Sequence, residues 1–230
     1  MIRMIFFDLG WTLLKPAGPG WLYNPLLLQM FPDISEETLS TEKWKTSAAD
    51  AYSPFIQNPY MKDTAEQKIR FADYYYELLN HAGFPCTHQQ AEILAEDLCE
   101  NTDNMVLLEG TEETLRTLKQ RGYRMAVISD TWPYIEKYLY ALGIDHYFEH
   151  FTYSCRLGTT KPSPMMFQDA LDACGIPPRE CLFIDDRGEN LEAAERFHMN
   201  AVQSCADPDL KKDPHFPEVT LPPDLLKLLP

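Results

Sequence analysis

Short apolar runs separated by longer amphipathic stretches dominate the start of the chain and its C-terminal half. Three of these runs are Ile2–Phe7, Arg124–Ile128 and Cys181–Ile184, and each is followed directly by polar residues. Runs of this length, bounded by turn-forming residues, predict buried strands. A further short strand is expected around Ala201–Ser204.

Helical patterns lie between and after these strands. The stretch Glu112–Arg121 stops at Gly122. Pro164–Cys174 starts with proline and stops at Gly175, which are helix start and stop signals. Glu189–Phe197 is a third stretch of similar length. Strands that alternate with such helices form βαβ units, so we expect an α/β fold with a doubly wound, Rossmann-like parallel sheet.

Residues 16–105 follow a different pattern. They begin with prolines and glycines and then become helical without intervening strands, with candidate helices over Ser35–Tyr52, Thr64–Ala82 and His88–Asn101. The segment is too long for a loop in a compact domain. We therefore expect an inserted α-helical subdomain over 16–105 and an α/β core made of 1–15 and 106–230. The proline-rich last residues are expected to pack on that core as a strap.

The composition is that of an ordinary globular chain with excess negative charge. Of the 230 residues, 45% are hydrophobic and 24% are charged, and the formal net charge is −15. This charge argues against binding to nucleic acid or to an anionic membrane, because both need basic faces. A small anionic substrate remains compatible, since a bound cation and one or two lysines can reverse the sign of the charge locally.

Signals for membrane insertion and export are missing from the sequence. No apolar run approaches the length of about eighteen residues that a membrane-spanning helix needs, and the N-terminus lacks the small-residue cleavage site of a signal peptide. The six cysteines form no C-x-x-C pair and are typical of reduced thiols. We therefore expect a cytoplasmic protein, whose oligomeric state the sequence leaves open.

Polar residues follow the predicted strands at the edge where open α/β sheets place their ligands. Asp8 comes directly after the first strand, and Gly10 allows a tight turn behind it. Ser129 and Asp130 follow the second strand, where a hydroxyl group and neighbouring amides can donate to phosphoryl oxygens. Taken singly, each group has an ordinary structural explanation, because these residue types are common in turns and helix caps.

Two further signals come later in the chain. Lys161 precedes the helix that starts near Pro164, and its ammonium group suits a phosphoryl group, although a lone lysine is usually just solvated. Asp185 and Asp186 follow the third strand, where adjacent carboxylates repel each other unless a cation binds. Mg²⁺ suits such a pair, and a polar helix N-terminus explains it equally well.

The order and placement of the four signals favour a common site. In a doubly wound sheet the loops that carry them face one crevice. Together they supply a carboxylate nucleophile, hydroxyl and amide donors, a lysine, and a carboxylate pair for a metal ion. Phosphoryl transfer needs such a set, since it depends on positioning and on charge neutralisation.

Four stretches in this order give the chain a resemblance to the haloacid dehalogenase superfamily of hydrolases. They are FFDLGWTL (6–13), VISDT (127–131), GTTKPSPMMF (158–167) and FIDDRGENLEAA (183–194). The expected helical insertion lies where this family has its helical cap, so the resemblance covers the whole predicted core. It implies a hydrolase and does not identify the substrate.

The resemblance also implies roles for the site residues. Asp8 would attack phosphorus and form an aspartyl-phosphate, which water later hydrolyses. Ser129 and Lys161 would bind the phosphoryl group. The ligands of Mg²⁺ would be Asp8, the backbone carbonyl of Gly10, and Asp186, with Asp185 bound directly or through water.

The first motif departs from the usual phosphatase pattern D-x-D-x-T. Gly10 stands where the second aspartate normally protonates the leaving group. General acid–base catalysis is worth roughly 10²–10⁴-fold in rate, so we expect a slow enzyme or one that selects good leaving groups. Some phosphatases similar to this chain also carry D-L-G at this place, so the glycine is compatible with activity. A second departure is His198, after Phe197, where the family often has glycine; we attribute it to packing.

We therefore expect a Mg²⁺-dependent phosphatase that acts on a small phosphorylated metabolite, such as a sugar phosphate. Asp130 and Trp11 are expected to contact the substrate as well, although aromatic residues near the cap are more often packed between cap and core. A catalytically weak phosphometabolite-binding protein of the same fold is the alternative that Gly10 favours. A phosphomutase is less favoured because it relies on the missing acid, and a metal-free dehalogenase does not suit the carboxylate pair.

Overall fold

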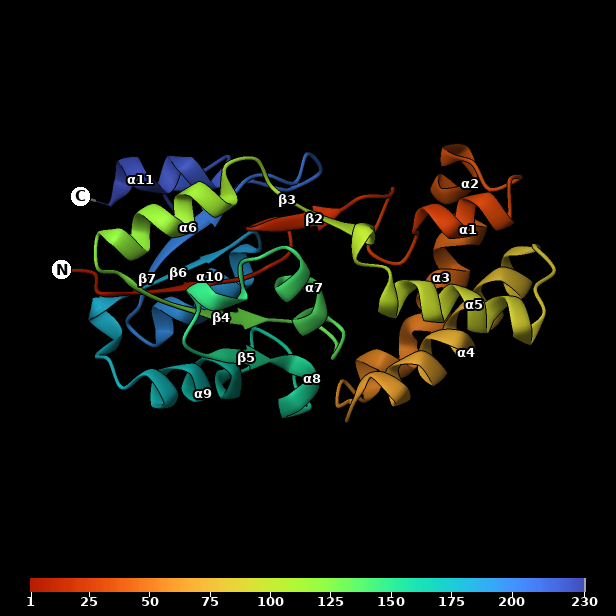
Figure 1. Ribbon diagram of the computed structural model, residues 1–230, viewed down its shortest axis with the longest axis horizontal. Helices are drawn as coiled ribbons and strands as arrows, with labels where there is room; N and C mark the ends of the chain where they lie inside the picture. The colour runs from red at the N-terminus through yellow and green to blue at the C-terminus, as the bar shows by residue number, and fades with distance from the viewer. Residues whose placement is uncertain (230) are drawn as a thin grey trace. The chain divides into compact units, whose positions relative to one another are not determined.

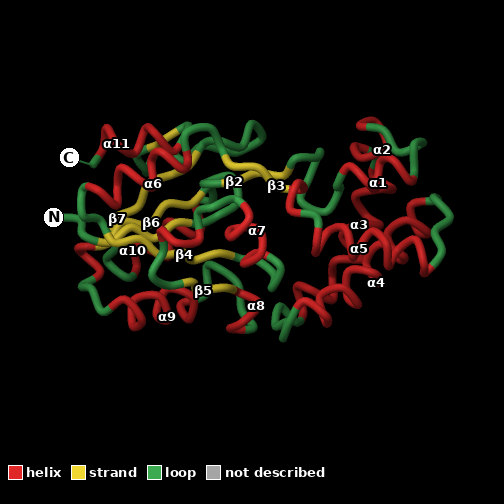
Figure 2. The backbone as a smooth tube through the Cα atoms, viewed as in Figure 1, coloured by secondary structure: helices red, strands yellow, loops and turns green. Residues whose placement is uncertain are grey.

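The computed structural model describes residues 1–229, which divide into two compact units (Figure 1). The first unit consists of residues 1–15, 106–131 and 139–229. The second consists of residues 16–105 and 132–138 and is mainly helical (Figure 2). Within the part of the chain that is described, no helix has the length and apolar character needed to cross a membrane.

Six parallel strands form the main sheet, which belongs to the first unit. They are β1 (Met4–Phe7), β4 (Arg124–Ser129), β5 (Phe151–Tyr153), β6 (Cys181–Asp185), β7 (Asn200–Ser204) and β8 (Glu218–Val219). Their order is β5-β4-β1-β6-β7-β8, and every described pair is parallel. The predicted α/β fold with a parallel sheet is therefore confirmed. Chain order runs outwards from β1 in both directions, which places the carboxyl end of β1 at a topological switch point.

Helices cover both faces of this sheet. The first unit contains α6 (Thr111–Gln120), α8 (Ser154–Leu157), α9 (Pro164–Cys174), α10 (Gly188–Arg196) and α11 (Leu225–Leu228), with 3-10 turns at Asp145–Tyr147, Pro178–Glu180 and Pro222–Asp224. α6 and α11 lie on one face and α9 on the other (Figure 1). Every residue of β1 is buried, and Phe6 shares a core cluster with Phe167 of α9 and Leu191 of α10. This core holds the carboxyl end of β1 in place.

Five helices make up most of the second unit. They are α1 (Pro25–Met30), α2 (Glu36–Ser40), α3 (Glu42–Gln57), α4 (Thr64–Ala82) and α5 (His88–Glu100), followed by a 3-10 turn at Thr102–Asn104. α4 packs along both α3 and α5, and buries Phe71 and Tyr75. The chain passes between the units through β2 (Leu14–Pro16) and β3 (Met105–Leu107), which pair with each other, and through α7 (Ile135–Ala141). The role of the second unit as a cap stays a prediction.

Capping residues explain where several helices begin and end. α4 starts after Asp63, whose carboxylate accepts a hydrogen bond from the first turn, and ends at Gly83, which has a φ of 98°. The single helix predicted over 35–52 is wrong. Thr41 ends α2 and also caps α3, because its hydroxyl accepts a hydrogen bond from the Trp44 amide. The sequence pattern does not predict β5, since a strand of three residues shows too little periodicity.

The end of α10 corrects another expectation. His198 is exposed and has a φ of 64°, so packing does not explain the residue type at this position. Its amide donates to the Glu195 carbonyl at 2.8 Å, and the Met199 amide donates to the Ala194 carbonyl at 3.1 Å. These two bonds form the Schellman motif of a helix end. Glycine suits this position because it has no Cβ to oppose the left-handed backbone.

The C-terminal segment packs on the core as a strap, as expected. The Arg121 guanidinium, just after α6, donates to the carbonyls of Leu226 and Leu229 at 3.2 and 2.6 Å. Leu225 is buried, and β8 extends the sheet beyond β7. The segment therefore covers α6 and adds an edge strand next to β7.

Candidate active site

Asp8 and Asp185 are neighbours at the carboxyl edge of the sheet. β1 and β6 pair with Phe7 opposite Ile184, and the Asp8 amide donates to the Ile184 carbonyl at 2.8 Å. The next residue along each strand is therefore Asp8 on one and Asp185 on the other. Both side chains are buried. The parallel register thus brings together two carboxylates that lie far apart in the sequence.

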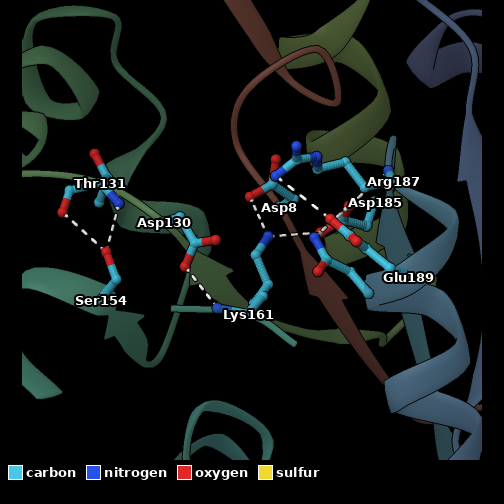
Figure 3. A network of polar contacts seen from close by, with 9 residues as sticks. Asp8, Asp130, Thr131, Ser154, Lys161, Asp185, Arg187 and Glu189 are labelled. Carbon is cyan, nitrogen blue, oxygen red and sulfur yellow. Dashed lines mark hydrogen bonds and ion pairs between the residues drawn. The ribbon is translucent and has the colours of Figure 1, made fainter. Parts of the chain in front are cut away.

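Lys161 connects these two carboxylates (Figure 3). Its ammonium nitrogen lies 2.6 Å from Asp8 Oδ1 and 2.5 Å from Asp185 Oδ2, and its side chain is almost entirely buried. The backbone amide of Lys161 donates to Asp130 Oδ1 at 2.9 Å, which ties the loop before α9 to the end of β4. The lysine predicted from sequence is therefore a buried ion-pair partner of the candidate nucleophile.

The adjacent acids Asp185 and Asp186 have different surroundings. Asp185 is fully buried and accepts hydrogen bonds from the Arg187 amide at 2.8 Å, from the Asn190 side chain at 3.0 and 3.1 Å, and from Lys161. Asp186 is only partly buried. Protein donors therefore surround Asp185, whereas Asp186 is the more accessible carboxylate for a cation.

Burial and mutual repulsion shift the acids of this cluster towards their neutral forms. Burial raises the pKa of Asp8 to about 6, against the opposing effect of the Lys161 charge. Burial, followed by the charges of Asp8 and Asp185, raises the pKa of Asp186 to about 8. Burial lowers the pKa of Lys161, but the charges of Asp185 and Asp8 outweigh it and hold that pKa above its usual range. A cation among the carboxylates would relieve their repulsion.

The residues at this edge fit a magnesium ion. Carboxylate oxygens of Asp8, Asp185 and Asp186 lie within 4.8 Å of one another, and they are the one such group of acidic or metal-ligating side chains in residues 1–229. The side-chain oxygen of Asn190 is buried and has no hydrogen-bond partner among the described atoms. Mg²⁺ prefers oxygen ligands and one or two carboxylates. The donor set therefore suits this ion.

Two residues predicted to contact the substrate, Ser129 and Asp130, lie at the end of β4 and directly after it. Ser129 is buried at the end of β4, and the exposed Asp130 accepts the hydrogen bond from Lys161. The Thr131 amide donates to Ser154 Oγ at 2.9 Å, and this hydroxyl donates to the Thr131 carbonyl at 3.2 Å (Figure 3). Ser154 is not predicted from the sequence, because it follows the strand β5, which is too short to show a pattern.

The loop after β1 folds back tightly. Trp11 has a φ of 51°, its amide donates to the Leu14 carbonyl at 2.8 Å, and its carbonyl accepts from Ser204 Oγ at 2.6 Å. A bulky residue rarely adopts this left-handed conformation, so surrounding bonds must hold it. Gly10 brings no side chain to the loop, and contact between Trp11 and substrate stays a prediction.

Two side chains of β7 that are not predicted from the sequence also reach the loops of the site. Ser204 bonds to the Trp11 carbonyl, and Gln203 donates to the Asp186 carbonyl at 2.9 Å. The signal was available, because both residues are polar and lie at the carboxyl end of a predicted strand.

The chain is similar in sequence to known proteins. The model of the haloacid dehalogenase-like hydrolases matches residues 2–198, which include every loop described above. The chain is 25% identical over 207 residues to the glyceraldehyde 3-phosphate phosphatase of Methanothermobacter thermautotrophicus, covering 88% of this chain and 85% of that protein. It is 33% identical over 100 residues, 43% of each chain, to the phosphoglycolate phosphatase of Pasteurella multocida.

Solved structures share the fold at lower sequence identity. L-2-haloacid dehalogenase from Xanthobacter autotrophicus has a TM-score of 0.73, with 14% identity and coverage of 100% of this chain and 98% of that chain. Identity this low shows a common fold only. The reaction must be inferred from the residues at the site.

Proposed function

Because the chain belongs to the haloacid dehalogenase-like hydrolase family, we propose that it is a Mg²⁺-dependent phosphatase of a small phosphorylated metabolite. One observation carries this proposal, the position of the Asp8 carboxylate. It is buried at the end of β1, lies 2.6 Å from the Lys161 ammonium, and belongs to the group of three carboxylates. A carboxylate in this position can attack a phosphoryl group whose charge the lysine offsets.

The reaction has two steps at Asp8. A carboxylate oxygen of Asp8 attacks phosphorus while the bond to the leaving oxygen breaks, which gives an aspartyl-phosphate and an alcohol. Water then attacks the phosphorus, so that inorganic phosphate leaves and the carboxylate is restored. Lys161 and Ser129 bind phosphoryl oxygens, and Asp185 orients Lys161. The leaving oxygen takes its proton from solvent, because Gly10 has none to donate.

The proposed ligands of Mg²⁺ are Asp8, Asp186 and the backbone carbonyl of Gly10, and Asp185 would bind the ion directly or through water. When bound, the ion offsets negative charge on the carboxylates and on the phosphoryl oxygens. The raised pKa of Asp186 supports this assignment, because the Lys161 charge does not offset the burial of Asp186 and its repulsion by Asp8 and Asp185. The buried side-chain oxygen of Asn190 supports it as well, because that atom has no hydrogen-bond partner among the described atoms and could accept a hydrogen bond from a water bound to the ion.

The proposed substrate class rests on the relatives and on the missing acid. Two relatives carry the names of glyceraldehyde 3-phosphate and phosphoglycolate phosphatases, and both compounds are small phosphate monoesters. Gly10 cannot protonate a leaving alkoxide, so esters with good leaving groups should react faster. The proposal includes no nucleic-acid or membrane partner, in keeping with the net charge of −15, and it places the enzyme in the cytoplasm.

Gly10 also favours a second candidate function, a catalytically weak protein that binds phosphorylated metabolites. Such a protein would show ligand-induced thermal shifts without turnover. A phosphomutase fits less well, because returning the phosphoryl group to a sugar relies on the absent acid. The three-carboxylate group opposes a metal-free dehalogenase, since unneutralised carboxylates would repel one another.

The proposal is tested by measuring phosphate release from a panel of phosphorylated metabolites and from p-nitrophenyl phosphate, with and without Mg²⁺. Asp8→Asn should abolish turnover, and EDTA should do the same. Asp172→Asn, an exposed acid on α9, serves as the matched control and should leave the rate unchanged. Turnover that survives Asp8→Asn would exclude the mechanism, and binding without turnover of any ester would favour the second candidate.

A further inference from the structure

The side chain of Gln203 makes three hydrogen bonds, one of them to the loop after β6, which carries Asp186. Its side chain is about 1% exposed. Nε2 donates to the Asp186 carbonyl at 2.9 Å and to the Lys211 carbonyl at 3.3 Å, and Oε1 accepts from the Asp213 amide at 2.8 Å. Only this orientation of the amide satisfies all three partners. Gln203 therefore joins the loop after β6 to the segment that follows β7.

Ser204, the next residue of β7, acts on a different loop. It is buried, and its hydroxyl donates to the Trp11 carbonyl at 2.6 Å. Trp11 has a φ of 51°, a conformation that needs support from its surroundings. The bond therefore holds the backbone directly after Gly10, three residues beyond Asp8.

From these contacts we propose that Gln203 and Ser204 are positioning residues, which set the distance between the loop that carries Asp8 and the loop that carries Asp186. The inference rests on the proposed Mg²⁺-dependent function. Asp8 directly follows β1 and Asp186 directly follows β6, and no hydrogen bond between their side chains could hold two ionised carboxylates together. Instead, the side chains of Gln203 and Ser204, adjacent residues of β7, each donate to a backbone carbonyl of one of the two loops.

The strap takes part in the same arrangement. Asp213, whose amide bonds to Gln203, lies against Gly188 at the start of α10, where an added Cβ would come within 3.2 Å of its carboxylate. His215 contacts Glu195 of α10 at 3.0 Å. The segment after β7 is thus bonded both to Gln203 and to α10, the helix that follows the loop carrying Asp186. Loss of the Gln203 amide would therefore remove a bond to the loop after β6 and two bonds to the segment after β7 at the same time.

The chain offers a matched control on the same strand. The side chain of Asn200, at the other end of β7, donates to the Cys181 carbonyl at 2.9 Å and to the Arg179 carbonyl at 3.2 Å. Gln203→Met and Asn200→Leu therefore each remove a side-chain amide that bonds backbone carbonyls beside β6. Only Gln203→Met removes the amide at the edge of the sheet that carries Asp186.

The test measures binding of Mn²⁺, as a spectroscopic substitute for Mg²⁺, from the loss of the free-ion electron paramagnetic resonance signal without substrate. Residues that orient metal ligands typically contribute 10–100-fold to metal affinity, so Gln203→Met should raise the Mn²⁺ dissociation constant about tenfold or more. Asn200→Leu should change it less than twofold. An unchanged constant for Gln203→Met, or equal weakening by Asn200→Leu, overturns the inference.

Ser204 provides the second arm, which also serves if Gln203→Met does not fold. Ser204→Ala should weaken Mn²⁺ binding and lower kcat, and Ser204→Thr, which keeps the hydroxyl group, should restore both. Failure of the threonine variant to rescue overturns the role of the hydroxyl. Because binding is measured without turnover, a wild-type protein that binds Mn²⁺ but hydrolyses no ester disproves the phosphatase proposal alone. A wild-type protein that binds no divalent cation overturns the positioning inference as well.

Discussion

The ammonium nitrogen of Lys161 lies 2.6 Å from a carboxylate oxygen of Asp8, although 153 positions separate the two residues in the sequence. Both side chains are buried, and Lys161 shares its charge with Asp185. A buried cation between two buried carboxylates stabilises the fold only while all three groups are present. The Lys161 charge also favours the ionised form of Asp8, which the proposed role of Asp8 as nucleophile requires.

Lys161→Met is expected to lower the free energy of unfolding by about 3–5 kcal/mol at pH 7, because it leaves two buried carboxylates without their cation. Urea denaturation measures this change. Lys137→Met is the control, since Lys137 pairs with Glu100 on the surface and should contribute less than about 1 kcal/mol. Equal effects of the two substitutions would contradict the importance of burial.

Without metal, the protein is expected to lose stability as the pH rises from about 4 towards 8. The folded pKa of Asp186 is about 8 and that of Asp8 about 6, both above the ordinary value of 3.8, so the folded state binds these protons more tightly than the unfolded state. Their contribution is present at low pH and disappears as the pH passes the folded pKa. Thermal unfolding in EDTA across this range measures the decline.

Two variations sharpen this prediction. Asp186→Asn should flatten the decline in Tm, because the substituted side chain does not titrate. Added Mg²⁺ should oppose the decline, and its apparent affinity should increase up to about pH 8 as Asp186 ionises. A Tm in EDTA that rises over this pH range would show that the cluster is not stabilised by protonation.

Gly10→Asp is expected to increase kcat/KM for alkyl phosphate esters by roughly 10–10³-fold, because it supplies a proton donor for the leaving oxygen. The backbone at Gly10 does not have a positive φ, so an aspartate can adopt it. The rate with p-nitrophenyl phosphate should change little, since that leaving group needs no acid. Gly10→Asn is the control of equal shape, and an identical gain with asparagine would show that proton donation is not the cause.

His198→Gly is expected to stabilise the protein by about 1 kcal/mol, because it removes a Cβ from a left-handed backbone position at the end of α10. Removal of the imidazole itself should cost little stability, because this side chain is exposed. Urea denaturation of the glycine and alanine variants separates the two effects. If His198→Ala stabilises as much as His198→Gly, backbone strain is not the reason.

Local signals in the sequence account for most of the fold. The buried runs of β1, β4 and β6 are long enough to be recognised, and the proline and glycine at the ends of α9 mark its limits. Thr41 divides a continuous helical pattern because its side chain can cap the next helix, a competition that periodicity does not show. The strand β5 is too short to produce a pattern, and Ser154 behind it is missed for that reason.

Apolar runs in the sequence predict β1, β4, β6 and β7, and they point to Asp8, Asp185 and Asp186 as the polar residues that follow such runs. Lys161 is predicted from its place before the helix that starts at Pro164. The folded chain adds three relationships: one ammonium group joins Asp8 to Asp185, Asp186 is more accessible than Asp185, and side chains of β7 bond to both loops. These relationships depend on strand register and order, which bring distant residues together by burying the core, and no local pattern encodes those distances.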